Sequence, residues 1–241
     1  MSRKIIDLSM PVHNNMVTFP RVVRPALLMY EDWEQFAERI GAAKYGVTWL
    51  TASYAIMTGD HVGTHIDSLK HLRKEGPGAE GIPVEYCYGD GVVLDFSHKE
   101  FGSAITAEEV EAALKKIGYA LKPLDIVLIY TGAGKINDSD DYLRNHCGMG
   151  ADATMHLINH GIKVMGIDAV TWDIPVWAMF EKKRFWESHR LMIDHEYYHL
   201  ENMMNLDTLL DRPTGFTVSV LPVKWVGTTA APVRAIAIRE D

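Results

Sequence analysis

One stretch, Gly59 to Leu72 (GDHVGTHIDSLKHL), constrains the fold more than any other part of the chain. It contains His61, His65, Asp67 and His71 in the pattern H-x3-H-x-D-x3-H. Each of these side chains can bind a divalent cation or move a proton near neutral pH. The fold must therefore bring several ionisable groups together and supply partners for them from elsewhere in the chain.

The local geometry of this stretch favours a metal site. His65 and Asp67 are two residues apart, so on an extended segment they face the same side. Gly59 and Gly63 allow backbone conformations through which neighbouring side chains converge. Two imidazoles and one carboxylate suit Zn²⁺ or Mn²⁺, and three protein ligands leave room for water. We therefore predict a site formed by His61, His65 and Asp67; the alternative is core or surface histidines that bind no metal.

Two further histidine pairs have the same four-residue spacing. His156 and His160 stand at the end of a predicted helix with no acidic residue between them, so we interpret them as structural. His195 and His199 belong to HEYYH, which matches the zinc-protease motif H-E-x-x-H. That motif requires a helix, whereas the Tyr-Tyr core favours a strand. We interpret HEYYH as a coincidental match and expect His199 to lie outside the metal site.

The composition is that of an ordinary globular protein. The chain has 241 residues, of which 47% are hydrophobic and 23% charged, and this length suits a single domain spanning residues 1–241. With 24 basic and 32 acidic residues the net charge is −8, and the only basic cluster is Lys182-Lys183-Arg184. We interpret that triplet as a surface turn and expect no nucleic-acid partner.

The sequence offers no sign of export or membrane insertion. No apolar run has the length of a signal peptide or a transmembrane helix. The two cysteines, Cys87 and Cys147, form no C-x-x-C motif and are too few for a disulfide framework. We therefore expect a cytoplasmic protein with no membrane partner.

Hydrophobic patterning predicts alternating strands and helices. Expected strands cover residues 4–8, 47–57, 91–96, 125–131, 163–168, 216–221 and 233–238, and expected helices cover 32–40, 106–117 and 151–160. The order strand, helix, strand from residue 125 to residue 168 suggests a βαβ unit with a right-handed crossover. The aromatic-rich segment 172–186 is expected to be a loop that shapes a pocket. Together these features predict one α/β domain.

Several motifs make the chain similar to cyclase-like metal-dependent hydrolases, the family that includes bacterial kynurenine formamidase and isatin hydrolase. The family signature H-x-G-T-H-x-D-x-x-x-H stands here as HVGTHIDSLKH, from His61 to His71. Further matches follow in order along the chain: IIDLSMPV, DIVLIYTG, GIDAVTWD, HLENMMNLDTL, GFTVSVLPVKW and APVRAIAI. The chain departs from the family at Ser68-Leu69, where Ala-Pro is usual, and at Glu201, where isatin hydrolase tends to carry Gln. The substrate and the number of metal ions therefore stay open.

The resemblance implies a fold and the missing partners of the motif. The family fold is a swivelling β/β/α domain with a mixed sheet, and its members usually form homodimers or homotetramers. His189 and Glu201 match the family's second histidine and the acidic or amide residue twelve positions later. Asp67 could then bridge a second cation held by His189 and Glu201. With one cation only, those two residues would orient water and substrate.

The ligand types indicate hydrolysis of an amide. A bound cation lowers the pKa of water and polarises a carbonyl group, which suits cleavage of a carbon–nitrogen bond in a small-molecule amide substrate. His71 is expected to shuttle the proton between water and the leaving nitrogen; the alternative is a further metal ligand. The candidates for an aromatic pocket wall are Trp49, Trp172, Trp177 and Phe185, with ordinary core packing as the alternative for each.

The leading functional hypothesis is a metal-dependent amidohydrolase that opens a cyclic amide, such as an isatin or a cyclic imide. The alternative is an arylformamidase acting on N-formylkynurenine. A non-catalytic binding protein on the same fold is the third possibility. For the site, we expect His65→Ala to remove the metal and the activity together, and His199→Ala to leave the metal bound.

Overall fold

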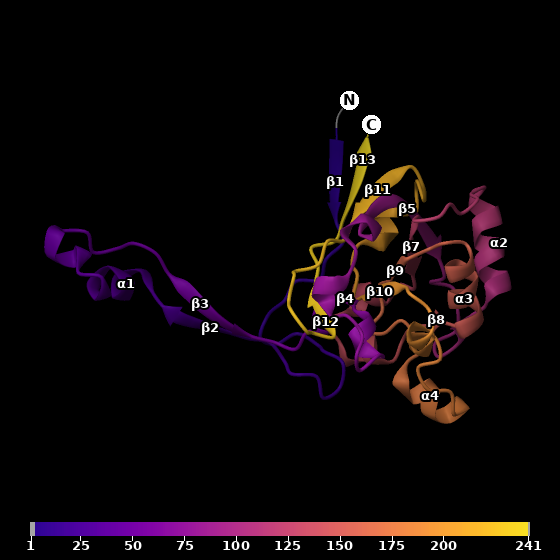
Figure 1. Ribbon diagram of the computed structural model, residues 1–241, viewed down its shortest axis with the longest axis horizontal. Coiled ribbons are helices and arrows are strands. Elements are labelled where there is room, and N and C mark those ends of the chain that lie inside the picture. Colours follow the sequence, from indigo (N-terminus) through magenta and orange to yellow (C-terminus); the bar gives the residue numbers. More distant parts are fainter. Residues whose placement is uncertain (1–2, 241) are drawn as a thin grey trace.

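A computed structural model describes residues 3–240 and shows one large curled mixed sheet with helices against it (Figure 1). Its nine strands run in the order β1-β13-β11-β5-β7-β9-β10-β4-β12. They are β1 (Arg3–Asp7), β13 (Ile236–Glu240), β11 (Phe216–Ser219), β5 (Tyr88–Asp95), β7 (Ile126–Tyr130), β9 (Val164–Ile167), β10 (Tyr198–Glu201), β4 (His65–Asp67) and β12 (Ala230–Pro232). The mixed α/β fold expected from the sequence is confirmed.

The centre of the sheet is parallel. β5, β7, β9 and β10 pair in parallel, and all five residues of β7 are buried. Helix α2 (Ala107–Ile117) connects β5 to β7, and α3 (Ala151–Asn159) connects β7 to β9; both lie on the same side of the sheet (Figure 1). β7 is buried on both of its faces, and strands of this kind are continuous apolar runs, as the sequence of residues 126–130 is. The expected βαβ unit is confirmed.

Local chemistry sets the ends of α2. The Thr106 side chain accepts a hydrogen bond from the backbone N–H of Glu109, and the Glu109 carboxylate accepts one from the Thr106 N–H. Gly118 ends the helix with a left-handed φ of 67°. The capping box and the terminal glycine were both visible in the sequence.

Two sequence expectations differ from the structure. The strand expected over 47–57 is shorter, because only β3 (Ser53–Met57) pairs with a partner, β2 (Ala26–Glu31). The loop expected over 172–186 contains a short helix, α4 (Val176–Lys182), which begins directly after Pro175. Proline at this position has a φ already suited to a helix start. A further short pair, β6 (Ala104–Ile105) with β8 (Gly148–Met149), lies outside the main sheet.

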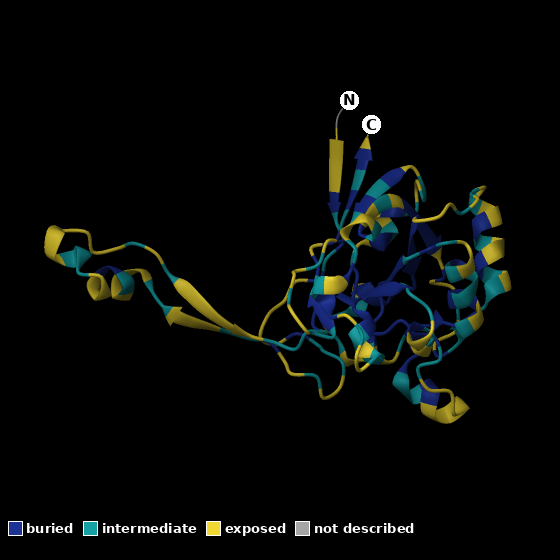
Figure 2. Cartoon of the chain, viewed as in Figure 1, coloured by how far each residue is buried: buried dark blue, intermediate teal, exposed yellow. Residues whose placement is uncertain are grey.

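A long hairpin extends away from the sheet. We call residues 23–58 the arm; it contains the β2–β3 ribbon, α1 (Trp33–Arg39) and a 3-10 turn, η1 (Ala42–Tyr45). Figure 2 shows that the arm is mostly exposed, whereas the centre of the sheet is buried. The arm closes at its base, where the Gly59 N–H donates to the carbonyl oxygen of Val23 over 3.2 Å.

No helix within residues 3–240 has the length and apolar character needed to cross a membrane. Both cysteines are buried and free, in line with the expectation that they form no disulfide framework.

Candidate metal centre

Two neighbouring strands carry most of the candidate ligands. β4 and β10 pair antiparallel, with Glu201 opposite His65. Residues opposite each other on paired strands point to the same face of a sheet, and residues two apart on one strand share that face. His65, Asp67, His199 and Glu201 therefore project together, and all four are buried.

Short turns bring three more histidines to the same place. His61 precedes β4, and His71 ends a 3-10 turn, η2 (Leu69–His71), that follows it. His189 begins another 3-10 turn, η7 (His189–Ile193). The ring centroids of His61 and His71 are 4.4 Å apart, and those of His71 and His189 are 5.9 Å apart. The structure thus brings every sequence-predicted ligand, and His71, into one cluster.

Asp67 stands at the centre of the cluster. Its Oδ1 lies 3.0 Å from His61 Nδ1 and 3.3 Å from His65 Nε2. Its Oδ2 lies 3.3 Å from His199 Nε2 and 3.6 Å from His71 Nε2. One carboxylate therefore faces ring nitrogens on both sides.

The second half of the cluster surrounds Glu201. Its Oε1 lies 3.3 Å from His189 Nε2 and 3.6 Å from His199 Nε2, and these two nitrogens are 3.2 Å apart. Two groups of side chains thus have ligand atoms close enough to hold an ion, and they share one member: Asp67, His189, His199 and Glu201 in one, and His61, Asp67 and His71 in the other.

Outer hydrogen bonds orient two of the buried histidines, His65 and His189. His65 Nδ1 donates to the carbonyl oxygen of Gly63 over 2.9 Å, which leaves Nε2 free to face the cluster. His189 Nδ1 binds the Asp173 carboxylate, and its Nε2 faces the cluster in the same way. Such partners fix the ring and the tautomer of a metal ligand. Gly63 has a φ of 65°, and a Cβ there would lie 2.6 Å from Val12 Cγ2, so the turn requires glycine.

His61 and Glu201 are held from outside as well. Thr229 Oγ1 donates to Asp60 Oδ2 over 2.7 Å, so it can accept from His61 Nε2, which lies 2.9 Å away. That arrangement leaves His61 Nδ1 toward Asp67. The backbone N–H of Trp172 donates to Glu201 Oε1 over 2.8 Å.

The cluster passes a test of fit for a divalent cation. Asp67 is fully buried, yet within residues 3–240 neither of its oxygens makes a hydrogen bond of good geometry. A buried carboxylate without partners is costly unless a cation compensates it. Two nitrogen ligands of a tetrahedral zinc ion lie roughly 3.3 Å apart. The two close nitrogen pairs, His61–His65 at 3.3 Å and His189–His199 at 3.2 Å, match that spacing.

The electrostatics favour positive charge at the same place. Burial opposes the charged form of His61, but the Asp67 carboxylate outweighs it and raises the pKa of His61 to about 9. Burial likewise opposes charge on His189, but hydrogen bonds to Asp173 and Glu201 raise its pKa to about 10. The surrounding imidazoles hold the pKa of Asp67 well below its usual range against the effect of burial. The cluster is therefore built around ionised carboxylates that attract cations.

His71 differs from the other histidines of the cluster. Burial lowers its pKa to about 4, and the charges of His61 and His189 act in the same direction. Its side chain is 33% exposed, whereas those of His65 and His199 are almost fully buried. A neutral imidazole at the open side of the cluster can accept a proton.

His199 is the residue that the sequence reasoning missed. The last two residues of HEYYH, Tyr198 and His199, lie on strand β10, and no part of the motif is helical, so the helical protease motif does not apply. The expectation that His199 lies outside the site was nevertheless wrong, because its Nε2 sits between Asp67 and His189. On a strand, His199 and Glu201 share a face, just as His65 and Asp67 do. The same alternation argument would have found it.

The cavity above the cluster has a volume of about 310 Å³. Its lining comprises the cluster residues His61, Asp67, His71, His189 and Glu201, with Phe19, Pro20, Arg21, Val22, Thr171 and Trp186. The Phe19 and Trp186 rings approach each other with centroids 6.4 Å apart. Arg21 has a φ of 69° and Trp186 a φ of 47°. Such backbone strain at non-glycine residues is frequent around functional sites.

None of the four aromatic candidates is part of this lining. Trp49 lies on the arm, stacked on Trp33 at 5.9 Å. Trp172 is fully buried behind the cluster, with its ring stacked on His199 and 5.8 Å from it. Trp177 and Phe185 border two other surface depressions. Phe19 and Trp186 form the aromatic wall instead. Their place in the wall depends on how two distant loops pack together, which the aromatic content of a segment does not reveal.

Comparisons with known proteins agree with this geometry. The model of the Cyclase family matches residues 6–174. The chain is 27% identical to the kynurenine formamidase of Bacillus cereus over 233 residues, which covers 96% of this chain and 95% of that protein. It is also 27% identical to the kynurenine formamidase of Bacillus anthracis over 235 residues, covering 97% and 96%.

Solved structures share the fold over nearly the whole chain. An isatin hydrolase bound to the product analogue thioisatinate superposes with a TM-score of 0.83 at 19% identity, covering 99% of this chain and 93% of that one. Isatin hydrolase A from Labrenzia aggregata superposes with a TM-score of 0.82 at 23% identity, covering 99% and 94%. The family match spans well over half of the sequence and contains the whole His61–His71 motif. This chain belongs to the Cyclase family.

Proposed function

We propose that this protein is a metal-dependent amidohydrolase that opens a cyclic amide fused to an aromatic ring, of the isatin or cyclic imide type. The observation that carries the proposal is the shared position of Asp67, whose two oxygens face both ligand groups at the floor of one cavity. A divalent cation bound there, Zn²⁺ or Mn²⁺, would lower the pKa of water and polarise the amide carbonyl.

The chain's own residues hold and orient the reacting groups. His61, His65 and Asp67 suit one cation, and Asp67 can reach a second held by His189, His199 and Glu201. Asp173 fixes the orientation of the His189 ring, and the Gly63 carbonyl oxygen fixes that of the His65 ring. Because these hydrogen bonds already orient the ligand rings, little reorganisation is needed when the cation and the substrate bind.

His71 is the residue placed to move protons. It borders the cavity, it is neutral near pH 7, and its Nε2 lies 3.6 Å from Asp67 Oδ2. In the proposed reaction it accepts the proton of the attacking water and passes it to the leaving nitrogen. The alternative role, a ligand in the group with His61 and Asp67, is consistent with the same geometry.

The cavity suits a small, flat, aromatic substrate. Phe19 and Trp186 form an apolar wall, and Arg21 is the basic side chain in the lining outside the histidine cluster. An aromatic ring fits against such a wall, while a guanidinium pairs with the carboxylate that hydrolysis of a cyclic amide creates. The similarity to isatin hydrolase structures supports this class of substrate.

An arylformamidase acting on N-formylkynurenine is the second candidate. The similarity to kynurenine formamidases, which extends over 96% of the chain, favours it. Isatin and N-formylkynurenine both contain an amide whose nitrogen is attached to an aromatic ring, so one cluster can serve either. A non-catalytic binding protein is disfavoured, because a binding protein does not need a proton-accepting His71 beside the ligand cluster.

Turnover assays test the proposal. Protein loaded with Zn²⁺ or with Mn²⁺ is assayed on isatin, on a cyclic imide and on N-formylkynurenine, and its metal content per chain is measured by elemental analysis. Protein stripped of metal is the control. Ring opening that depends on the metal supports the leading proposal, whereas formamidase activity without ring opening contradicts it. Stable metal binding without turnover of any amide would favour a binding protein.

A further inference from the structure

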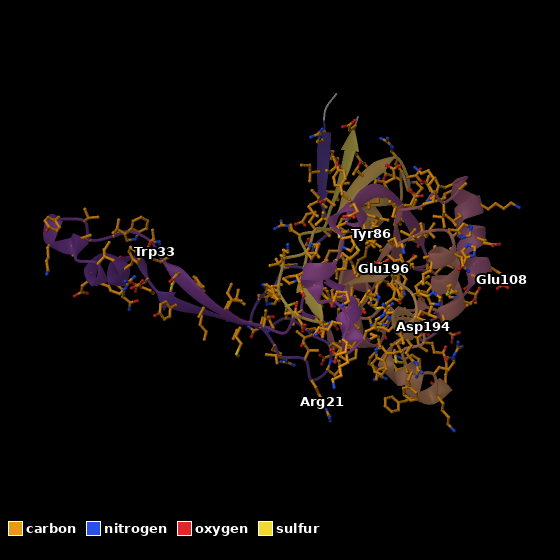
Figure 3. All side chains as sticks on the ribbon, in the orientation of Figure 1. Arg21, Trp33, Tyr86, Glu108, Asp194 and Glu196 are labelled. Atoms are coloured by element: carbon orange, nitrogen blue, oxygen red, sulfur yellow. The ribbon has the colours of Figure 1, made fainter. Side chains whose placement is uncertain are left out.

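Two buried polar side chains, Tyr142 and Asn202, lie beside the metal centre but belong to neither ligand group. Tyr142 is fully buried, and Asn202 is 6% exposed. Polar side chains usually project into solvent, as Glu108 does from the outer side of α2 in Figure 3. Burying a polar group is costly unless hydrogen bonds satisfy it, so the partners of these two side chains indicate their role.

A chain of hydrogen bonds joins Tyr142 to the candidate ligand His65. The Tyr142 hydroxyl donates to Asn202 Oδ1 over 2.8 Å. On its other side, the Asn202 amide donates through Nδ2 to the carbonyl oxygen of Gly63 over 3.1 Å. The same oxygen accepts from His65 Nδ1 over 2.9 Å. A carbonyl oxygen has two lone pairs, so it can accept both hydrogen bonds at once.

The Gly63 carbonyl decides where the protons of its two partners lie. A carbonyl oxygen can only accept, so the NH₂ group of Asn202 faces it. For the same reason His65 carries its proton on Nδ1, because a bare Nδ1 would set its lone pair against that oxygen. His65 Nε2 is then left with the lone pair that a cation requires. The Tyr142 hydroxyl supports this arrangement, because its donation to Oδ1 disfavours a turned-over amide.

The peptide between Gly63 and Thr64 depends on such support. Gly63 has a φ of 65°, and glycine has access to other backbone conformations that would turn its carbonyl away from His65. Two hydrogen bonds hold the peptide from opposite directions. The Asn202 amide binds the Gly63 oxygen, and the Thr64 hydroxyl donates to the Asn202 carbonyl oxygen over 2.6 Å. The turn before β4 is therefore clamped to the end of β10.

Residue 202 has to combine an amide with a left-handed backbone. Its φ is 57°, directly after Glu201, the last residue of β10. Glycine adopts this conformation readily but has no side chain, and asparagine is one of the few other residues that tolerate it. Asparagine at this position can therefore end the strand and bind the Gly63 oxygen at the same time.

The segment that carries Tyr142 is also anchored beside the site. Tyr142 lies on a 3-10 turn, η6 (Asp140–Leu143), in the connection between β7 and β8. The Asp168 carboxylate accepts hydrogen bonds from the N–H groups of Thr131, Gly132 and Gly134 at the start of this connection. The Tyr142 hydroxyl lies 3.4 Å from the Asp168 carbonyl oxygen. A connection fixed in this way can hold the hydroxyl in one direction.

We propose that Asn202 is a positioning residue that holds His65 in its metal-binding tautomer through the Gly63 carbonyl, and that Tyr142 acts through Asn202. The inference rests on the metal centre of the proposed function. It gives the β7–β8 connection a part in that centre, although none of its residues belongs to the two ligand groups.

Asn202→Gly tests the role of the amide, because glycine keeps the left-handed backbone and removes the side chain. The affinity of the full-length chain for Zn²⁺, measured by competition with a chelator, should fall by about 10-fold, the lower end of the effect of losing an outer partner. In the zinc-loaded protein, NMR should show the His65 ring N–H exchanging with solvent about 10-fold faster, because its acceptor is no longer held. A role in stability alone would not change that exchange.

Asn205→Gly is the matched control. Asn205 has the same φ of 57°, and its Nδ2 also donates to a backbone carbonyl oxygen, that of Asp7, over 2.8 Å. It belongs to neither ligand group. Its replacement should leave both the zinc affinity and the exchange of the His65 ring N–H unchanged.

Tyr142→Phe removes one hydroxyl and tests the second step. It should lower zinc affinity by about 2- to 10-fold, the contribution of one hydrogen bond. In the Asn202→Gly background it should cost no further affinity, because the two residues act in series. Tyr119→Phe, which removes a hydroxyl that donates to Asp125 over 2.9 Å, is the control.

The possible outcomes separate this inference from the proposed function. A chain that binds Zn²⁺ equally well with and without the Asn202 amide, with unchanged exchange at His65, overturns the role of Asn202. Losses that add up in the double variant overturn the series between Tyr142 and Asn202. A wild-type chain that binds no Zn²⁺ overturns the metal centre and, with it, both proposals. Because no measurement uses turnover, the identity of the substrate does not affect the result.

Discussion

The metal centre and the arm depart from the usual distribution of residues in opposite ways. The centre buries two carboxylates and a set of imidazoles, although charged groups normally stay in water. The arm exposes tyrosine, isoleucine and methionine side chains that normally lie inside. Each region lacks a complement within residues 3–240. The buried charges call for a cation, whereas the apolar side chains of the arm stay exposed.

The two regions also differ in how they are held. His65, Asp67, His199 and Glu201 lie on two paired strands of the main sheet. Outer hydrogen bonds fix the rings of His65 and His189. The arm joins the body at its base, near Val23 and Gly59, and through two hydrogen bonds between Asn14 and the backbone of Leu27. Rigidity suits a site where small displacements cost rate, whereas few contacts at the base tie the arm loosely to the body. The comparison predicts that changes in one region leave the other largely intact.

The largest effect is expected from Asp67→Asn. This change removes the charge that both ligand groups share, so the metal content should fall to near zero and hydrolysis by about 10³-fold or more. Elemental analysis and turnover rates measure the two losses. The association state should not change. Asp194→Asn, at an exposed carboxylate outside the cluster, is the control. Full metal content in Asp67→Asn would show that the cation does not need this buried charge, and would contradict the contrast drawn between the metal centre and the arm.

The two histidines of the HEYYH segment offer a more specific pair of variants. His199→Ala removes a ligand nitrogen and should lower metal affinity more than the roughly 10–100-fold that loss of an outer partner costs. His195→Ala changes the other histidine of the same motif, which belongs to neither ligand group, and should leave the affinity unchanged. Competition with a chelator measures both. Equal effects would mean that strand geometry does not select the ligands.

Metal affinity should depend on pH. The pKa of His61 is raised to about 9 and that of His189 to about 10, so both rings carry a proton at neutral pH that a cation must displace. Below those values the apparent affinity should fall as the pH falls, by about tenfold per pH unit for each proton displaced. Titrations between about pH 7 and about pH 8 check this. A flat profile would show that neither ring becomes a ligand.

The smallest effect is expected on the free energy of unfolding, when the caps of two helices are removed one at a time. Asp32 and Thr106 form the same capping box, one on the arm helix α1 and one on the body helix α2. Thr106→Ala should lower the free energy of unfolding by about 1 kcal/mol. Asp32→Ala should change it by less than ~0.5 kcal/mol, because α1 shares no core with the body. Urea unfolding of each variant measures both free energies; equal losses would contradict an arm that is independent of the body.

Much of the local structure was predictable from the sequence. The cap at Thr106, the end of α2 at Gly118 and the buried strand β7 follow from patterns within a few residues, since hydrogen bonding and side-chain period act at short range. The placement of His65 and Asp67 on one face followed from the same alternation. The aromatic wall of the cavity could not be predicted in this way, because Phe19 and Trp186 come from loops more than a hundred residues apart.

By itself, the sequence determined which chemistry the motif offers, because the spacing of His61, His65 and Asp67 is covalent and local. Only the tertiary structure decided what completes it. The register between β4 and β10 sets His199 and Glu201 against the motif, and no local pattern encodes a strand pairing across more than a hundred residues. The fold likewise places the arm away from the sheet, which leaves 12 large apolar side chains between Val23 and Met57 exposed within residues 3–240.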